Sequence, residues 1–485
     1  MIRDLTPRAD QYADVVIVGG GLAGIACAIG LHGSGLKVVL LEETGSLGGR
    51  ARSWVDRMSG DVIDIGPHVL LGEDTNLLAL LDQLGTSGHI VWQRERRPPG
   101  ASLRDKLSNR AVLWLAMQMR EEDVLRLDDM SAADLLHRYD VAPRLIEWFW
   151  ASVCLSALNV PLEQCSAGAL MRVYSQYVSH PRRLGFADCG LGDLYVPAAL
   201  RSIMAAGGRV HLRTRVVALV LHCGKAAGVL LEDGTRINAT HCVMAMPPQS
   251  LARLLPARCR AQRPFCDTRV FEPSPQVSVY LWLDRKLASD RYWARAACGT
   301  QLNNEFYDLS NIRTGWSGRA SVIAGNIIHS HRADNLSDEE LIAATLAELA
   351  DVVPGASRAR VLHSVVNRIP MAVPCPAPGT EQKRPDTTTT IPGLFLAGDW
   401  TRTHLPACME SAVRSGWLAA EGVWSAIGRP RSVACPSRPP EGVAGLVQRV
   451  MSRARRAPHV RVHRPAPLGA QLRLNEAAGP DQTAR

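Results

Sequence analysis

Apolar positions near the start of the chain form short runs separated by glycines. Residues 15–18 are Val-Val-Ile-Val, residues 19–21 and Gly24 are glycine, and residues 25–29 are small or apolar. A further apolar run at 38–41 ends at Glu42. Short apolar runs bounded by glycine predict buried strands, and the longer run between them predicts a helix. We therefore expect a strand, a glycine turn, a helix and a second strand across residues 15–42.

The pattern is helical from about 86 to 194 and then changes to short strands. Residues 145–158 are apolar nearly all round, which predicts either core or the wall of an apolar cavity. Alternating residues at 277–283, 303–307 and 320–328 predict a sheet suited to floor a substrate cavity. Other strands are predicted at 209–212, 216–221, 228–232, 236–238, 241–246 and 391–397, with a hairpin turn at 233–234, helices at 166–177, 195–206 and 406–423, and a helix opened by a capping box at 337–340.

The first of these stretches has the features of a unit that binds a dinucleotide. Gly19 permits a tight turn, Gly21 lets the backbone approach a pyrophosphate, and Gly24 lets the helix pack closely on the strand. Glu42 ends the second strand, where a carboxylate accepts hydrogen bonds from ribose hydroxyls. Residues 15–36 contain no charged side chain and also resemble a membrane or signal segment, but their glycine content favours a buried strand and helix.

Later motifs add candidate contacts for the same ligand. Gly48-Gly49-Arg50 combines glycines with an arginine that can bind phosphate. Gly66-Pro67-His68 is a rigid turn, and its histidine is either catalytic or structural, with the structural interpretation favoured. Asp399 follows a buried strand at the position where α/β sheets bind ligands, and the helix that starts near Met409 presents free N–H groups and a positive dipole end.

Composition describes a globular chain with room for more than one domain. Of its 485 residues 46% are hydrophobic and 21% are charged. The twelve cysteines include no Cys-x-x-Cys pair, so no zinc site or dithiol motif is predicted, and reduced thiols in a cytoplasmic protein are expected. The net charge is +9. We expect no nucleic-acid partner, because the excess lies almost entirely in the last part of the chain.

That last part is basic and rich in proline. From residue 429 onward there are eleven arginines against Glu441, Glu476 and Asp481. One interpretation is an amphipathic helix with Val443, Val447, Val450 and Ala454 on one face, which would place the protein at the inner face of a membrane. The prolines favour the other interpretation, a disordered extension over residues 429–485.

Together these motifs resemble the FAD-dependent amine oxidase and phytoene desaturase superfamily. The resemblance rests on residues 19–24, Glu42, 48–50, 66–68, 398–399 and 410–416, and it spans most of residues 13–427 in the expected order. Within the superfamily the chain is most similar to the hydroxysqualene dehydroxylases of hopanoid pathways, on the basis of residues 68–72, 154–161 and 397–410.

The resemblance implies an α/β fold with a Rossmann-type FAD-binding domain and an inserted α+β substrate domain. The FAD-binding domain is expected in three parts, at 1–80, 195–250 and 385–428, with the substrate domain at 81–194 and 251–384. The implied FAD contacts are Gly19, Gly20, Gly21, Leu22, Ala23, Gly24, Glu42, Gly49, Arg50, Gly66, Pro67, His68, Val216, Gly398, Asp399 and Met409. The backbone of Val216 is assigned to adenine, Arg50 to the phosphates, Asp399 to the ribityl or pyrophosphate side, and Met409 to the flavin ring.

The implied reaction removes the hydroxyl of hydroxysqualene, a long apolar isoprenoid, and the electron partner stays open. His68 and His404 are weak candidates for the proton donor. The alternatives are oxidative desaturation of a polyene, an amine oxidase, and a nonenzymatic flavoprotein that keeps only the fold. An amine substrate calls for aromatic side chains around the flavin, whereas the tryptophans here gather in the helical segment, which favours an apolar substrate.

Overall fold

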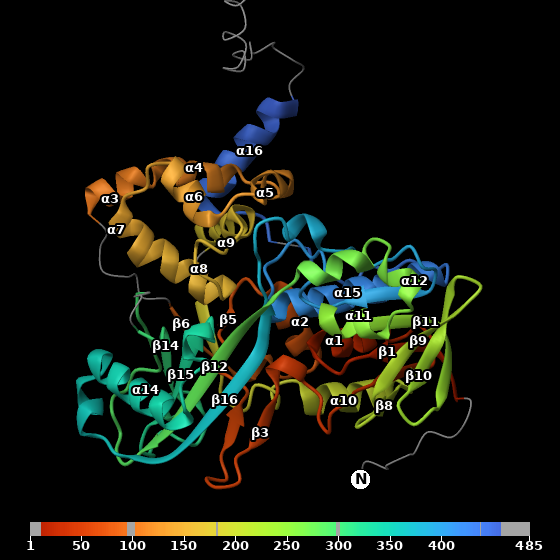
Figure 1. The fold of residues 1–485 in the computed structure, drawn as a ribbon, viewed down its shortest axis with the longest axis horizontal. Helices are drawn as coiled ribbons and strands as arrows, with labels where there is room; N and C mark the ends of the chain where they lie inside the picture. The colour runs from red at the N-terminus through yellow and green to blue at the C-terminus, as the bar shows by residue number, and fades with distance from the viewer. Residues whose placement is uncertain (1–10, 95–101, 181–182, 297–300, 437, 457–485) are drawn as a thin grey trace, which may run out of the picture.

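The structure is a computed structural model that describes residues 11–94, 102–180, 183–296, 301–436 and 438–456 (Figure 1). A first half built around a mixed sheet and a second half made of a helical part and an antiparallel sheet share one long cavity. Among the described residues, no helix is both long and apolar enough to cross a membrane.

A seven-stranded sheet forms the centre of the first half. The predicted strand, turn, helix and strand are confirmed as β1, α1 and β2, and β1 pairs in parallel with β2 on one side and with β11 on the other. All its strands come from the three segments in which the sequence predicts the FAD-binding domain. They are β1 (Gln11–Val18), β2 (Val38–Leu41), β8 (Arg209–His211), β9 (Val216–His222), β10 (Lys225–Leu231), β11 (Arg236–Ala245) and β17 (Leu394–Ala397).

Strand β11 corrects one detail of the sequence interpretation. Residues 236–238 and 241–246 were predicted as separate strands, because polar residues interrupt the apolar pattern between them. The structure has one continuous strand, since β1 pairs with it from Ile237 to Met244. Its first residues also pair antiparallel with β10 across the predicted hairpin turn, and its last residues pair in parallel with β17. Backbone pairing on both sides thus continues the strand through the polar positions.

Four helices cover one face of this sheet, and α11 (Pro248–Leu254) and α12 (Ala257–Arg260) pack on the other. Helix α1 (Leu22–Gly30) lies against α15 (Met409–Ala426), and the crossing is so close that a Cβ on Gly416 would come 2.1 Å from the Ala23 carbonyl oxygen. Helices α2 (Thr75–Gln83) and α10 (Val196–Ala205) pack beside them. The small side chains of the glycine motif and of α15 are therefore needed for helix packing as much as for ligand approach.

The second sheet is antiparallel, in the order β13-β14-β15-β12-β16. Helix α14 (Asp338–Val352) covers one face, and Ser337 and Glu340 form the capping box that the sequence predicts. The opposite face is turned toward the cavity. The strands are β12 (Pro273–Leu283), β13 (Tyr292–Ala294), β14 (Glu305–Asp308), β15 (Val322–Ile328) and β16 (Val361–Pro374).

The helical part covers the other side of the cavity. Its helices are α3 (Leu103–Ser108), α4 (Arg110–Gln118), α5 (Glu121–Leu127), α6 (Ala132–Arg138), α7 (Pro143–Leu145), a π-helix (Ile146–Trp150), α8 (Ala151–Leu158) and α9 (Ala167–Ser179). Both interpretations of residues 145–158 hold, because Trp150 and Cys154 are core whereas Phe149 and Val153 line the cavity. The remaining elements are short: β3 (Ser53–Val55), β4 (Val62–Asp64), β5 (Leu70–Leu71), β6 (Ile90–Arg94), β7 (Arg183–Ala187) and α13 (Leu309–Ile312).

The prediction of a disordered extension from residue 429 is wrong for its first half. Glu421 accepts hydrogen bonds from the backbone N–H groups of Val433 and Ala434 at 2.6 and 2.8 Å, and Asn76 Oδ1 accepts one from Cys435 at 2.8 Å. Residues 442–456 then form helix α16 (Gly442–Arg456), which contacts α4 and α9. Hydrogen bonds to α15 and α2 therefore order this segment despite its prolines. Residues 457–485 lie outside the described residues.

Candidate active site

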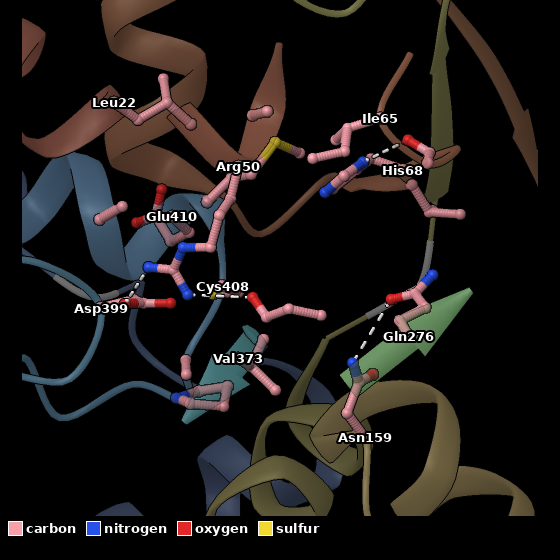
Figure 2. A pocket seen from close by; sticks show the side chains of 18 of the residues that line it. Leu22, Arg50, Ile65, His68, Asn159, Gln276, Val373, Asp399, Cys408 and Glu410 are labelled. Carbon is pink, nitrogen blue, oxygen red and sulfur yellow. Dashed lines mark hydrogen bonds and ion pairs between the residues drawn. The ribbon is translucent and has the colours of Figure 1, made fainter. Parts of the chain in front are cut away.

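One cavity of about 1980 Å³ runs from the glycine turn of α1 to the space between the antiparallel sheet and helices α8 and α9. Figure 2 shows the middle of it, where Arg50, His68 and Asp399 face the same space as Asn159 and Gln276. A typical ligand pocket measures about 300–1,000 Å³. The cavity therefore has room for a dinucleotide and a large second ligand.

The glycine turn lies at the first end of the cavity. Gly19, Gly21, Leu22 and Ala23 line it, so the N-terminal turn of α1 faces the space as expected for a pyrophosphate site. Gly20 and Gly24 lie behind the wall instead. A Cβ on Gly24 would come 1.9 Å from the Gly19 carbonyl oxygen, so this glycine is required by packing of the helix on the strand.

The carboxylate of Glu42 is buried at the same end and is held by two loops. Its Oε2 accepts a hydrogen bond from the Gly20 N–H at 2.7 Å, and its Oε1 accepts from the N–H and hydroxyl of Thr44 at 2.9 and 2.8 Å. These bonds fix the carboxylate beside the glycine turn. A carboxylate at the end of the second strand can accept hydrogen bonds from the hydroxyl groups of a ribose.

Arg50 and Asp399 were predicted as separate cofactor contacts, and the structure brings them together. Arg50 Nη2 lies 2.7 Å from Asp399 Oδ1, and Nη1 donates to the carbonyl oxygen of Ala372 at 2.9 Å (Figure 2). Asp399 is buried, whereas the Arg50 side chain is 32% exposed within the cavity. The pair therefore joins the loop after β2, strand β16 and the loop after β17 at the centre of the cavity.

His68 lies on the cavity wall with a defined tautomer. Its Nδ1 is 2.8 Å from the Gly66 carbonyl oxygen, which can only accept, so Nδ1 carries the hydrogen. Burial lowers the pKa of His68, which keeps the ring neutral and leaves Nε2 as an acceptor. Because an acceptor nitrogen carries no proton, this state does not fit the predicted role of proton donor.

His404 was predicted as a weak candidate for the proton donor, but the structure places it away from the cavity wall, and this corrects the prediction. His404 Nδ1 lies 3.2 Å from Glu121 Oε1, and the imidazole is 51% exposed. Glu121 also pairs with Arg172, whose guanidinium pairs with the buried carboxylate of Glu381. His404 is therefore part of an ionic network between α5, α9 and the segment before β17.

The remaining predicted contacts lie on the wall. They are Gly49, Gly66, Pro67, Val216, Gly398 and Met409. Val216 starts β9 near Glu42, and Met409 starts α15. Sequence reasoning missed Asp74, Glu305, Tyr307 and Asn326, which also line the cavity. For the last three, the signal was their alternation along two predicted strands, which indicates one shared face of the sheet.

These residues fit a flavin dinucleotide. The wall carries a helix N-terminus without side-chain obstruction, a fixed buried carboxylate and a basic side chain paired with an acid, in one space that continues to an apolar chamber. Fold and site define a flavin-dependent oxidoreductase. A family model described as flavin containing amine oxidoreductase matches residues 22–424, and the chain belongs to this family, with FAD as its cofactor.

Three curated relatives are named as phytoene or zeta-carotene desaturases. The chain is 25% identical over 460 residues to the 15-cis-phytoene desaturase of Solanum lycopersicum, covering 86% of this chain and 79% of that protein. It is 25% identical over 455 residues to the enzyme of Synechococcus elongatus, covering 84% and 95%, and 25% identical over 481 residues to a zeta-carotene desaturase of Zea mays, covering 84% of each. These relatives support the superfamily and leave the dehydroxylase assignment as a proposal.

Solved structures show the same fold at lower identity. Wild-type putrescine oxidase bound to putrescine superposes with a TM-score of 0.66 at 18% identity, covering 86% of this chain and all of that one. An oxidoreductase from Methanosarcina mazei superposes with a TM-score of 0.67 at 18% identity, covering 85% and 99%. The expected α/β fold is confirmed.

Proposed function

We propose that the protein acts on an isoprenoid lipid and, in particular, that it reductively dehydroxylates hydroxysqualene to squalene. The observation that carries this is the single cavity that joins the dinucleotide end to an apolar chamber. Trp148, Phe149, Val153, Ala157 and Leu184 line that chamber, which suits a long hydrocarbon chain. When bound and reduced, FAD supplies a hydride.

The overall reaction replaces a C–OH bond by a C–H bond and releases water. It consumes one hydride equivalent and one proton, so a two-electron donor such as a reduced nicotinamide must restore the cofactor after each turnover. The chain itself has to bind the apolar substrate, exclude bulk water and hold a proton near the leaving hydroxyl.

Asp74 is suited to hold that proton. It lies on the cavity wall at the start of α2, and its Oδ2 accepts a hydrogen bond from the Leu71 N–H at 2.8 Å. Burial, and then the neighbouring Glu410 carboxylate, raise the pKa of Asp74 well above its usual range, which favours the protonated, neutral form of the group. Of the two sequence candidates, His68 is held neutral and His404 lies outside the cavity, so Asp74 replaces both as our proposed donor.

The test is anaerobic. The flavin of the purified protein is reduced, hydroxysqualene is added, and flavin reoxidation and squalene are both followed. Reoxidation coupled to squalene is the expected result, and Asp74→Asn should slow it at least tenfold while FAD stays bound. Stable reduced flavin without squalene would contradict the proposal.

Desaturation of a polyene is the second candidate, because the chain matches most of the length of curated relatives that are named as desaturases. It moves hydride in the opposite direction, from substrate to oxidised cofactor. Oxidised protein incubated with phytoene should then gain absorbance from conjugated products, and no squalene should form in the reductive assay.

A membrane surface is the partner that we propose for this lipid chemistry. Val443, Leu446 and Val450 of α16 are 57–70% exposed, as are Leu103 of α3 and Trp114 of α4 at 75% and 51%. Helices α4 and α16 contain no Asp or Glu, and Arg104, Lys106, Arg110 and Arg449 are exposed on these three helices. Exposed apolar side chains among cations suit an anionic bilayer.

The cavity reaches the molecular surface next to this region. Tyr177 and His180 at the end of α9 line it, together with the exposed Arg438 in the segment that leads into α16. The Glu441 N–H donates to the Ser179 carbonyl oxygen at 2.9 Å, which fixes that segment to α9. A lipid leaving a bilayer at α16 would therefore have a short path into the chamber.

Liposome flotation tests the membrane contact. With vesicles containing an anionic phospholipid, the double variant Val443→Glu, Leu446→Glu should float at least fivefold less than wild type, because a charge replaces each inserted side chain. Leu362→Glu changes an equally exposed apolar residue on β16 and should float normally. Equal flotation of all three proteins would overturn the membrane assignment. The same holds if wild type does not float but forms a dimer that the double variant does not form.

A further inference from the structure

A group of polar side chains in the substrate chamber has no part in the proposed transfer of hydride and proton. Glu305 pairs directly with Asn326 across β14 and β15, and Tyr307 follows two residues later on the same face. All three line the cavity, and they are only 8%, 4% and 2% exposed. A carboxylate, an amide and a phenol that are this deeply buried each require a hydrogen-bond partner.

The hydrogen bonds of this group are incomplete. The Tyr307 hydroxyl donates to Glu305 Oε2 at 2.5 Å. Asn326 Nδ2 lies 3.4 Å from the Pro67 carbonyl oxygen, and because that oxygen can only accept, the amide nitrogen must face it. Asn326 Oδ1 is then buried without a hydrogen-bond partner among the described residues. The chamber thus presents an unsatisfied acceptor beside a carboxylate.

The group is next to the end of the cavity where FAD binds. Pro67, which Asn326 contacts, precedes His68 in the turn on the cavity wall. His68 Nε2 is a further acceptor, since Nδ1 donates to the Gly66 carbonyl oxygen. Acceptors therefore gather where the apolar chamber meets the FAD site, and a ligand that satisfies them must bring a donor.

We propose that Glu305, Tyr307 and Asn326 form a subsite that binds a hydrogen-bond donor, a hydroxyl or an ammonium group, on an otherwise apolar substrate. The subsite selects such a molecule against the matching hydrocarbon, because the hydrocarbon leaves Asn326 Oδ1 unpaired. It deepens the proposed function by naming how this cavity recognises its substrate, and it rests on that function only for the apolar chain. It applies for either direction of hydride transfer.

Ligand binding to the oxidised, FAD-loaded protein tests the subsite without turnover. The probes share one C20 isoprenyl chain: geranylgeraniol, geranylgeranylamine and the hydrocarbon that ends in a methyl group. Binding is followed by quenching of tryptophan fluorescence. Wild type should bind the alcohol or the amine about ten- to a hundredfold more tightly than the hydrocarbon.

Two variants should remove this preference. Glu305→Gln keeps the size of the side chain and removes its charge, so an ammonium ligand should lose most affinity and a hydroxyl ligand less. Asn326→Leu removes the unpaired acceptor and should bring the alcohol and the hydrocarbon to within about threefold of each other. Asn304→Leu is the matched control, because Asn304 is equally buried with an unpaired Oδ1 but does not line the cavity.

The outcomes separate this proposal from the reaction. Equal binding of all three ligands by wild type, or an unchanged preference in both variants that retain FAD, would overturn the subsite even if hydroxysqualene is converted. A preference that depends on Glu305 and Asn326 supports it even if no squalene forms. Tighter binding of the amine than of the alcohol identifies an ammonium group as the donor, and the reverse identifies a hydroxyl.

Discussion

At the scale of single residues, the two ends of the cavity are built in different ways: the cofactor end from one short unit of the chain, the substrate end from strands that meet only in the fold. Gly19, Gly21 and Glu42 stand at spacings fixed by the backbone geometry of one short unit, so a local pattern suffices. Glu305 and Asn326 become neighbours only through the register of β14 on β15. Asp74 acquires its raised pKa from burial and then from Glu410, neither of which can be read from residues nearby in the sequence.

Glu42→Gln should weaken FAD binding about ten- to a hundredfold. The charged carboxylate accepts hydrogen bonds from Gly20 and Thr44, and a hydrogen bond to a charged group contributes about 1.5–3 kcal/mol. Titration of the apoprotein with FAD measures the change. Glu339→Gln alters an exposed carboxylate in the first turn of α14 and should leave the affinity unchanged; a similar loss in both variants would mean that overall charge decides the affinity.

At the scale of elements, strands and helices followed from the sequence wherever burial and pattern agreed. The division of β11 was wrong because Asn238 and Thr240 are polar, yet β1 pairs alongside them. The extension after residue 428 was misjudged because its proline content outweighed a few specific bonds, among them the one between Asn76 and Cys435. In both cases partners distant in sequence supplied the missing stabilisation.

Gly416→Ala should destabilise the protein by about 1–3 kcal/mol and reduce FAD retention. The added methyl group would overlap the Ala23 carbonyl oxygen, so α15 must move away from α1. Thermal unfolding and the flavin content after gel filtration measure the two effects. Gly318→Ala is the control, since a Cβ there meets no atom within 4 Å. Equal stability of both variants would show that the crossing tolerates a wider spacing.

At the scale of the whole molecule, an ionic network joins the helical part to the cofactor end. Burial alone would raise the pKa of Glu121, but the hydrogen bond with His404 and the charge of Arg172 lower it to about 2. Arg172 continues the network to Glu381, and Arg384 links Glu381 to the carbonyl oxygen of Asp399 at 2.9 Å. The relative position of the two parts therefore depends on charge.

This network predicts an acid-sensitive contribution to stability. Because the pKa of Glu121 is lower in the folded state than in the unfolded chain, its contribution is complete above about pH 4.5 and is lost as the pH falls toward 2. Glu121→Gln should cost about 1–2 kcal/mol at pH 6, a value discounted for solvent screening, and only a small part of that near pH 2.5. Urea unfolding across this range measures it, and a difference independent of pH would contradict the assignment.

The segment after α15 predicts a difference between two truncations. A chain ending at Gly428 loses the contacts of Val433, Ala434 and Cys435 with Glu421 and Asn76, whereas one ending at Pro436 keeps them. The shorter chain should be less stable by about 2–4 kcal/mol, since several partly buried hydrogen bonds are lost together. The chain ending at Pro436 keeps these bonds but lacks the contacts of α16 with α4 and α9, so its melting temperature should lie between those of the shorter chain and the full protein. Equal melting of both truncations would show that residues 429–436 contribute nothing.

The crossing of α1 and α15 also has a consequence for synthesis on the ribosome. The indole of Trp424 donates to the Gly30 carbonyl oxygen at 3.0 Å, across 394 positions of sequence. Helix α1 forms early, but its packing partner leaves the ribosome only when almost all of the family core has been translated. The nascent chain must keep an apolar βαβ unit from aggregating throughout that interval, so a chaperone that binds exposed apolar segments should improve the yield of holoprotein more than added FAD does.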